Sequence, residues 1–469
     1  MKRKKDTYED IFGLEITGIT DDGRGIARQE GMVVFVEGAV PGDVADVVLK
    51  KRKKTFSEAF VKNIVTPSPD RIEPSCRHFG MCGGCRWQNL TYEKQLYYKN
   101  LHVTDSFERI AKVKIEESMP ILPAEKTYFY RNKLEYTFSA RAWLTKREIS
   151  EGKSGVDGNA LGFHVPRFFD RIFDVQECLL QEEPSNNIRL FFKKECELAG
   201  LSFQDIRGQF GCLRNLMIRT TSTGEIMVIL IVRDQDIEKS KKILDDAAVK
   251  FPNVVSWMYA INPKSNDSYY DLQFILHNGK DHILEILDGV KFRIGPKSFF
   301  QTNSDQAKNL YRIAVEMAGL SGKENVYDLY TGTGSIALYA SKHCAKVTGI
   351  ETVSEAIEDA WINAELNGIK NVSFHAGDVL KVLDDVFISE HGKPNVIITD
   401  PPRAGMHEKV VEKMMEIAPE KIVYISCNPA TQARDIALMS EKYAVKKIQP
   451  VDMFPHTVHV ENVALLVRK

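Results

Sequence analysis

The chain has 469 residues, enough for about three domains of ordinary size. Hydrophobic residues make up 43% and charged residues 27%, with a formal net charge of −1 at pH 7. That composition is typical of a globular protein and excludes a largely disordered one, and the balanced charge favours no anionic partner. The longest apolar run, Ile226 to Val232, is too short to cross a bilayer. We therefore expect a cytoplasmic protein without a membrane contact.

The first 67 residues carry short β-like runs separated by turns. The runs span 13–17, 32–36, 45–49 and 56–64, and the turns contain Asp22-Gly23, Glu30-Gly31 and Pro41-Gly42-Asp43. This spacing predicts a small antiparallel β-barrel over 1–67. We expect the basic tract at 50–54 on a loop tip, where it tracks a phosphate backbone or is only a solvated turn. In these turns and strand spacings the segment resembles the TRAM domain, an oligonucleotide-binding-type barrel of RNA-modification enzymes.

A proline-containing linker at 67–74 and a group of cysteines follow the predicted barrel, and 92–112 carries apolar residues at helical spacing. Between 125 and 290, β-like runs alternate with turn-rich stretches. We interpret 68–290 as a central α+β domain that contains the cysteines, with a helical stretch at 92–124 packing on the C-terminal domain.

The last part of the chain, 291–469, is predicted to form an α/β domain. From residue 321 onward, helical patterns separate β-like runs at 326–330, 347–351, 372–375, 396–399 and 422–426. Alternation at this spacing predicts a doubly wound, mainly parallel, Rossmann-like sheet. The stretch 443–467 holds two further runs without a helix between them, which we interpret as an antiparallel edge pair.

A nucleoside pocket is predicted where the first of these strands meets Gly332 and Gly334, because glycines let a ligand approach the backbone. Glu351 and Asp378 end the next two strands, where carboxylates can accept hydrogen bonds from ribose hydroxyls. A dinucleotide is the competing ligand. The third glycine of its fingerprint is replaced by Ala337, so we favour S-adenosylmethionine.

Cys427 ends the fifth strand and precedes a predicted helix that starts near Ala430. A helix N-terminus favours the thiolate form of a cysteine, so this position suits a nucleophile, although a buried structural cysteine is the commoner case. Asp400 and Arg403 end the fourth strand and are expected on the same crevice.

Five motifs in chain order resemble the RNA uracil-C5 methyltransferase family. They are Phe299-Phe-Gln-Thr-Asn303, Asp328-Leu-Tyr-Thr-Gly-Thr-Gly334, Asp400-Pro-Pro-Arg-Ala-Gly405, Ser426-Cys-Asn-Pro-Ala-Thr431 and Asp452-Met-Phe-Pro-His-Thr-Val-His-Val-Glu461. The resemblance implies that the protein methylates carbon 5 of a uridine in RNA to give 5-methyluridine. It implies that Cys427 adds to carbon 6 and that Glu461 removes the carbon 5 proton.

The same resemblance assigns further roles. Asp400 and Arg403 would hold the uracil edge, Phe299 would stack near the base, and Gln301 would lie between the base and the donor. The implied donor-binding residues are Gln301, Tyr330, Ser335, Glu351, Asp378 and Asp400.

Cys76, Cys82 and Cys85 lie in a glycine-rich segment that lets three thiolates converge, and three ligands need a fourth. By resemblance to family members with a four-iron four-sulfur (4Fe-4S) cluster, the fourth is Cys178. Zinc is the alternative, since four thiolates also suit a tetrahedral site. We expect the metal site to serve folding and RNA placement.

Other readings stay open at this stage. Cytosine-C5 methylation uses the same thiol addition, and a non-catalytic RNA-binding iron-sulfur protein would need no nucleophile. Family members with both a TRAM-like domain and the cysteines resemble enzymes of 23S rRNA processing, while a transfer-RNA substrate is the alternative. RNA is the expected partner, and no obligate protein partner is indicated.

Overall fold

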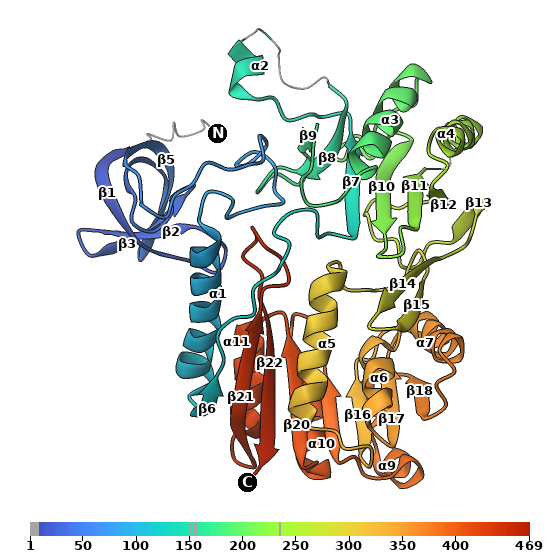
Figure 1. Ribbon diagram of the computed structural model, residues 1–469. Helices are drawn as coiled ribbons and strands as arrows, with labels where there is room; N and C mark the ends of the chain where they lie inside the picture. Colours follow the sequence, from blue (N-terminus) through green and yellow to red (C-terminus); the bar gives the residue numbers. More distant parts are fainter. Residues whose placement is uncertain (1–8, 151, 153–157, 234–235) are drawn as a thin grey trace.

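The computed structural model describes residues 9–150, 152, 158–233 and 236–469, which form a barrel and two large sheets. Figure 1 shows the barrel beside a central sheet, with the C-terminal sheet below the central one. Across these described ranges, no helix is long and apolar enough to cross a membrane.

The N-terminal barrel closes in the strand order β1-β2-β3-β5-β4. Its strands are β1 (Asp10–Ile19), β2 (Gly25–Gln29), β3 (Met32–Glu37), β4 (Val44–Arg52) and β5 (Phe56–Thr66). Alternating residues such as Val34 and Val36 fill its core. The predicted barrel is confirmed with two corrections. β3 and β5 run parallel, and the basic tract is mostly strand, because β4 extends to Arg52 and leaves only the next residues for the turn.

The central sheet has seven strands in the order β13-β12-β11-β10-β7-β8-β9. They are β7 (Lys133–Ser139), β8 (Ala160–His164), β9 (Ile172–Asp174), β10 (Leu213–Thr220), β11 (Ile226–Val232), β12 (Val254–Ile261) and β13 (Phe274–Gly279). The short helix α2 (Lys146–Ser150) precedes β8, and α3 (Ser185–Leu198) and α4 (Ile237–Lys250) pack on the sheet. Every residue of β11 is buried, as its unbroken apolar sequence requires.

A hairpin of β14 (Ile283–Leu287) and β15 (Val290–Ile294) leads from the central sheet to the C-terminal part. Helix α5 (Ser304–Ala318) follows it. The side chain of Asn303 accepts from the backbone N–H of Gln306 at the start of α5, and Gly319 ends the helix with a φ of 59°. Both are the residue types that helix ends favour, so the sequence defines this helix locally.

The C-terminal sheet has eight strands in the order β18-β17-β16-β19-β20-β22-β21-β6. They are β6 (Ile115–Ser118), β16 (Asn325–Leu329), β17 (Lys346–Glu351), β18 (Val372–Ala376), β19 (Val396–Thr399), β20 (Lys421–Ser426), β21 (Tyr443–Val451) and β22 (Glu461–Arg468). The remaining α-helices are α6 (Ser335–Ala340), α7 (Ser354–Leu366), α8 (Val379–Val382), α9 (Asp385–His391), α10 (Glu408–Ile417) and α11 (Pro429–Met439).

The five β-like runs predicted from residue 321 onward form parallel strands, as expected. The last two strands are antiparallel, but they are not the edge of the sheet. β6, which lies more than 300 residues earlier in the chain, pairs in parallel with β21 and takes the edge position. Its four residues carry too little apolar periodicity to be recognised from sequence.

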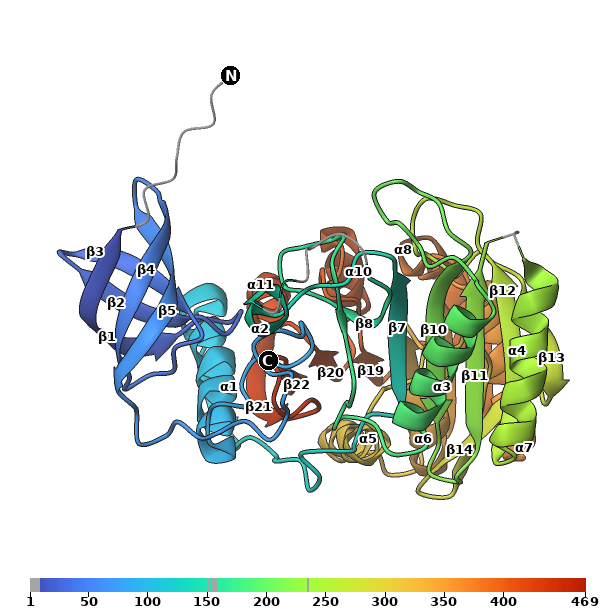
Figure 2. The same cartoon turned by 90° about the horizontal axis from the view of Figure 1, so that it is seen from above.

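Helix α1 (Tyr92–Ser106) continues as one π-helical segment to Ala111, so it is shorter than the expected stretch 92–124. Val103 and Phe107 are fully buried in the core of the C-terminal sheet, together with Ile436 of α11. The helix thus packs on the C-terminal sheet, and Figure 2 shows it between the barrel and that sheet.

Candidate active site

The carboxyl ends of the five parallel strands lie at one edge of the C-terminal sheet, where open α/β sheets bind ligands. The predicted site residues Tyr330, Glu351, Asp400 and Cys427 end or directly follow strands at this edge. The topology therefore brings these four residues to a single crevice.

The turn after β16 is built for a close approach of the backbone. Gly334 has a φ of 80°, and a Cβ there would lie 3.1 Å from Ala360. The backbone N–H groups of Gly332 and Val353 donate to the two carboxylate oxygens of Glu351, at 3.1 and 3.0 Å. The Glu351 carboxylate is thereby fixed beside the glycine turn, as a ribose-binding acid requires.

Asp378 is exposed and caps helix α8, because its carboxylate accepts from the backbone N–H of Leu380 at 2.9 Å. The negative charges of Asp378 and Glu351 contribute to raising the pKa of Tyr330 to about 12, with burial as the larger cause. The three predicted donor-binding residues are therefore electrostatic neighbours.

Asp328 and Tyr311 join this group, although sequence analysis assigned neither a role. Burial raises the pKa of Asp328 to about 7, the Thr331 hydroxyl donates to its Oδ2 at 2.6 Å, and its Oδ1 has no hydrogen-bond partner among the described residues. Tyr311 of α5 is buried and hydrogen-bonds Ser335. Asp328 belongs to one of the five sequence motifs, whereas no sequence pattern marks Tyr311 as a functional residue.

A buried carboxyl oxygen without a side-chain partner is costly in a folded protein, so Asp328 Oδ1 is available to a ligand. Burial, together with the negative charges of Asp400 and Glu351, raises the pKa of Asp328. An acidic crevice with a glycine turn suits a nucleoside ligand that carries positive charge. The residues present therefore fit S-adenosylmethionine, which is a sulfonium cation.

Cys427, Asp400, Glu461 and Arg403 form one electrostatic group. Burial and the repulsion of Asp400 raise the pKa of Glu461 well above its ordinary value, and burial raises the pKa of Asp400 to about 7. Burial and the two carboxyl groups raise the pKa of the Cys427 thiol to about 11, against the opposing effect of Arg403. The four predicted catalytic residues are thus electrostatic neighbours.

The helix N-terminus after Cys427 does not by itself make this thiol acidic. Asn428 caps α11, with its side-chain oxygen accepting from the backbone N–H of Ala430 at 3.1 Å. Its Nδ2 donates to the backbone oxygen of Arg403 at 3.1 Å. Burial beside two carboxyl groups outweighs the helix end, and the thiol holds its proton.

The loop before α5 carries Phe299 and Gln301. The Phe299 side chain is 65% exposed, while Gln301 is buried. Asn132 donates to the backbone oxygen of Gln301 at 2.9 Å, and the buried Arg219 donates to that of Ser298 at 3.0 Å. The central sheet therefore fixes this loop. The stacking and donor-contact roles of Phe299 and Gln301 stay predictions.

The segment before Glu461 is anchored by helix α1. The Lys99 ammonium donates to Asp452 at 2.6 Å, with both side chains fully buried, and the Tyr92 hydroxyl donates to the same carboxylate at 2.8 Å. The backbone N–H groups of Arg86 and Trp87 donate to the oxygen of His456 at 2.8 and 3.0 Å. The segment that follows the cysteines therefore contacts the segment that leads to Glu461.

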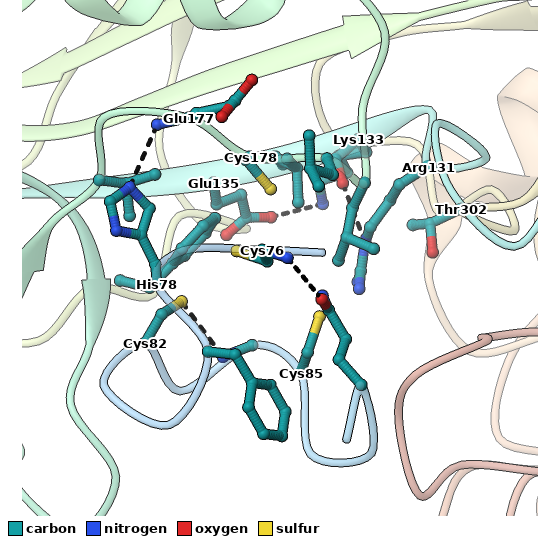
Figure 3. A pocket seen from close by; sticks show the side chains of 18 residues that line it. Cys76, His78, Cys82, Cys85, Arg131, Lys133, Glu135, Glu177, Cys178 and Thr302 are labelled. Carbon is teal, nitrogen blue, oxygen red and sulfur yellow. Dashed lines mark hydrogen bonds and ion pairs between the residues drawn. The ribbon is translucent and has the colours of Figure 1, made fainter. Parts of the chain in front are cut away.

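Cys76, Cys82, Cys85 and Cys178 line one cavity of about 420 Å³. Figure 3 shows their four sulfur atoms around this space. Burial, with the other cysteines as like charges, raises the pKa of both Cys82 and Cys85 to about 12. Ionised thiols at these positions need a bound cation or cluster.

The spacing of the four thiols bears on which metal group they could hold. No group of three or more histidine, cysteine or acidic residues within the described ranges is placed to hold a metal ion. Tetrahedral zinc needs all sulfurs about 2.3 Å from one centre. The four thiols share one cavity, and the metal or cluster that they hold stays a prediction.

Comparison with known proteins adds the family context. The family described as tRNA (Uracil-5-)-methyltransferase matches residues 278–469, and the TRAM domain matches 11–62. An uncharacterized RNA methyltransferase of Bacteroides thetaiotaomicron is 51% identical over 95% of this chain and 99% of its own. One from Porphyromonas gingivalis is 49% identical over 97% of this chain and 99% of its own.

A solved structure also aligns with nearly the whole molecule. The Pyrococcus abyssi tRNA (uracil-54, C5)-methyltransferase, in complex with S-adenosyl-L-homocysteine, has a TM-score of 0.74 and 29% identity. The alignment covers 97% of this chain and 100% of that one.

Proposed function

Because the chain belongs to the family of S-adenosylmethionine-dependent RNA uracil-5 methyltransferases, we propose that Cys427 and Glu461 carry out the two halves of this reaction on a uridine in RNA. The observation that supports this most strongly is the meeting of Cys427, Asp400, Glu461 and Arg403 at the strand ends. A cysteine that served only packing would not need two buried carboxyl groups beside it.

The chemistry accounts for each member of the group. Carbon 5 of uracil is a poor nucleophile until the thiolate of Cys427 adds at carbon 6 and turns the ring into an enolate. Arg403 and Asp400 hold the uracil edge, and the guanidinium stabilises the enolate oxygen. After carbon 5 has gained the methyl group, Glu461 removes its proton, the carbon 5–carbon 6 double bond forms again and the thiolate leaves.

Proton positions link this chemistry to donor binding. The pKa of Cys427 is raised to about 11, and the pKa of Glu461 lies well above its ordinary value. The donor, when bound, supplies the methyl group and a positive charge. In that field Cys427 and Glu461 lose their protons more readily, so the nucleophile and the base become competent when the donor site is filled.

The donor site in this proposal consists of the strand-end residues already predicted. They are Gln301, Tyr330, Ser335, Glu351, Asp378 and Asp400. The Glu351 carboxylate, fixed by two backbone N–H groups, supports the ribose contact. The buried Asp328 and Tyr311 would support these donor-binding residues from the interior of the domain.

We further propose that Cys76, Cys82, Cys85 and Cys178 bind a 4Fe-4S cluster that supports folding and RNA placement. The four thiols around one cavity support this. Anaerobic purification followed by iron and sulfide analysis tests it, with Cys82→Ala as the variant. Iron and sulfide in wild type but not in Cys82→Ala are expected, whereas stoichiometric zinc in wild type would overturn it.

The proposed RNA is 23S rRNA in the cytoplasm, and transfer RNA is the second candidate. A tRNA methyltransferase aligns with 97% of this chain, so overall length and fold do not separate the two substrates. The cysteine-lined cavity is the feature that favours ribosomal RNA, by the resemblance stated above.

Mass spectrometry of nucleosides from the two RNA pools tests the proposal. A strain lacking the gene is complemented with wild type or Cys427→Ala. We expect 5-methyluridine to fall in ribosomal RNA and to return only with wild type. A fall in transfer RNA alone selects the second candidate, and unchanged 5-methyluridine in both pools refutes methylation.

A further inference from the structure

On the outer face of the barrel, one arginine packs on one of two neighbouring aromatic rings. Val34 and Val36 point into the barrel core, so Phe35 and Glu37 of β3 face outward. The Arg24 guanidinium lies 4.8 Å from the centre of the Phe35 ring. Phe35 in turn contacts Phe56 edge-on at 5.4 Å between ring centroids. Such a face suits unpaired nucleic acid, whose bases stack on aromatic rings.

This face continues onto the central sheet. Glu37 of the barrel forms an ion pair with Arg167 at 3.1 Å, and Arg167 lies on the loop between β8 and β9. The next two residues of that loop, Phe168 and Phe169, are 43% and 67% exposed. Large exposed aromatic side chains in neighbouring positions are unusual on a protein surface and indicate a binding site.

The turn at 205–210 supplies the basic partner of this loop. The Arg207 guanidinium lies 5.7 Å from the centre of the Phe169 ring and forms an ion pair with the buried Asp170. Phe210, on the same turn, is 60% exposed. The buried Asp170 carboxylate therefore holds Arg207 beside the exposed Phe169 ring, and the same turn carries a second exposed ring, Phe210.

The turn is rigid before any ligand binds. The Asp205 carboxylate accepts from the backbone N–H groups of Arg207 and Gly208 at 2.9 and 2.8 Å, and from the guanidinium of Arg141 at 2.8 Å. Ordering costs reduce affinity, so a site fixed in advance binds more tightly than a flexible one.

We propose that Phe169, Arg207 and Phe210 form a second stacking site for unpaired RNA bases that flank the target uridine. The proposal rests on the proposed function and names how that function holds its substrate. The site lies where the barrel, the cysteine-containing loop and the central sheet meet. A Cβ at Gly83 of that loop would collide with the backbone oxygen of His164, just before the Phe169 loop.

Two features favour RNA over a protein partner. The exposed arginines at the site are Arg167, which pairs with the outward-facing Glu37, and Arg207, whose carboxylate partner Asp170 is buried. Arginine beside exposed aromatic rings combines phosphate attraction with a stacking surface. RNA that follows the aromatic face of the barrel would reach this site next.

The test compares RNA of two lengths. One barrel of this type covers about 4–16 nucleotides, so a labelled oligouridine of about 6 nucleotides occupies the barrel alone and one of about 30 reaches beyond it. We expect the double variant Phe169→Ala/Phe210→Ala to bind the long oligouridine about tenfold more weakly than wild type, with the short one unchanged. Phe169→Tyr/Phe210→Tyr should restore binding, because the rings return.

Leu198→Ala is the matched control, because Leu198 is a 71% exposed apolar side chain at the end of α3, outside the proposed stacking site. Equal binding of the long RNA by wild type and the double alanine variant would overturn the proposal, as would an equal loss in Leu198→Ala. Methylation of RNA transcripts separates the two claims. If the double variant methylates with an unchanged KM, the stacking site is refuted and the proposed function stands. If wild type does not methylate but the double variant binds RNA more weakly than wild type, only the proposed function is refuted.

Discussion

Replacing Asp328 by asparagine should remove a pH dependence from the stability of the C-terminal sheet. Burial raises the pKa of this carboxyl from 3.8 to about 7, and only the Thr331 hydroxyl bonds it among the described side chains. Below about pH 4 the carboxyl is protonated in both the folded and the unfolded chain, so it does not lower the free energy of unfolding. Between about pH 4 and pH 7 only the unfolded chain gives up the proton, and stability falls.

The magnitude follows from the difference in pKa. A difference of about 3 at about 1.4 kcal/mol for each pKa unit corresponds to about 4 kcal/mol, lost by pH 8. Asp328→Asn keeps the acceptor for Thr331 but has no proton to lose. Between pH 5 and pH 8, the free energy of unfolding should therefore fall less in the variant than in wild type, by up to about 3 kcal/mol.

Hydrogen exchange of the β16 and β17 amides, corrected for intrinsic rates, measures this because it reports the opening of this sheet rather than of the whole chain. Asp378→Asn is the control, since Asp378 is exposed and asparagine caps α8 equally well. If the stability of Asp328→Asn and that of wild type change equally with pH, the pKa of the Asp328 carboxyl is not raised by burial.

Three further outcomes are expected. Between pH 6 and pH 8, affinity for S-adenosylmethionine should rise more steeply in calorimetry than affinity for S-adenosylhomocysteine, which lacks the sulfonium charge. Asp328 and Asp400, each with a pKa raised to about 7, become anionic partners for the sulfonium over this range; equal slopes would contradict this. Glu461→Gln should accumulate a covalent RNA complex on denaturing gels, since the adduct forms but the carbon 5 proton stays; free RNA alone would argue against Glu461 as the base. Lys99→Met should lower the free energy of unfolding in urea by about 3–5 kcal/mol, because Asp452 stays buried without its cation. The control Lys62→Met, at the exposed ion pair with Asp10, should lower it by less than about 1 kcal/mol. Equal losses in the two variants would refute the burial argument.

The parts that could be predicted from sequence are those whose signal is local. The parallel strands from β16 to β20 follow from apolar runs at regular spacing, and the strand-end positions of Glu351 and Cys427 follow from them. Strands β2 and β6 escaped prediction for physical reasons. β2 begins with a glycine and has only five residues, and β6 is stabilised by pairing with a strand far away in the chain.

The electrostatics of the site could not be read from sequence. Cys427 before a helix suggested an acidic thiol, but Asp400 and Glu461 reach it from two other strands and raise its pKa to about 11. Tyr311 sits on an ordinary amphipathic helix, and only the folded chain places its hydroxyl against Ser335. Each depends on a contact between residues distant in sequence.

The most direct test of covalent catalysis uses RNA in which 5-fluorouridine replaces uridine. Fluorine takes the place of the carbon 5 proton, so Glu461 has nothing to remove and the adduct cannot collapse. The protein, S-adenosylmethionine and this RNA are incubated, digested and analysed by peptide mass spectrometry. We predict a methylated fluorouridine on the peptide that contains Cys427, formed only with the methyl donor present; a digest without this adduct, or with the adduct on another cysteine, would contradict the assignment of Cys427 as the nucleophile.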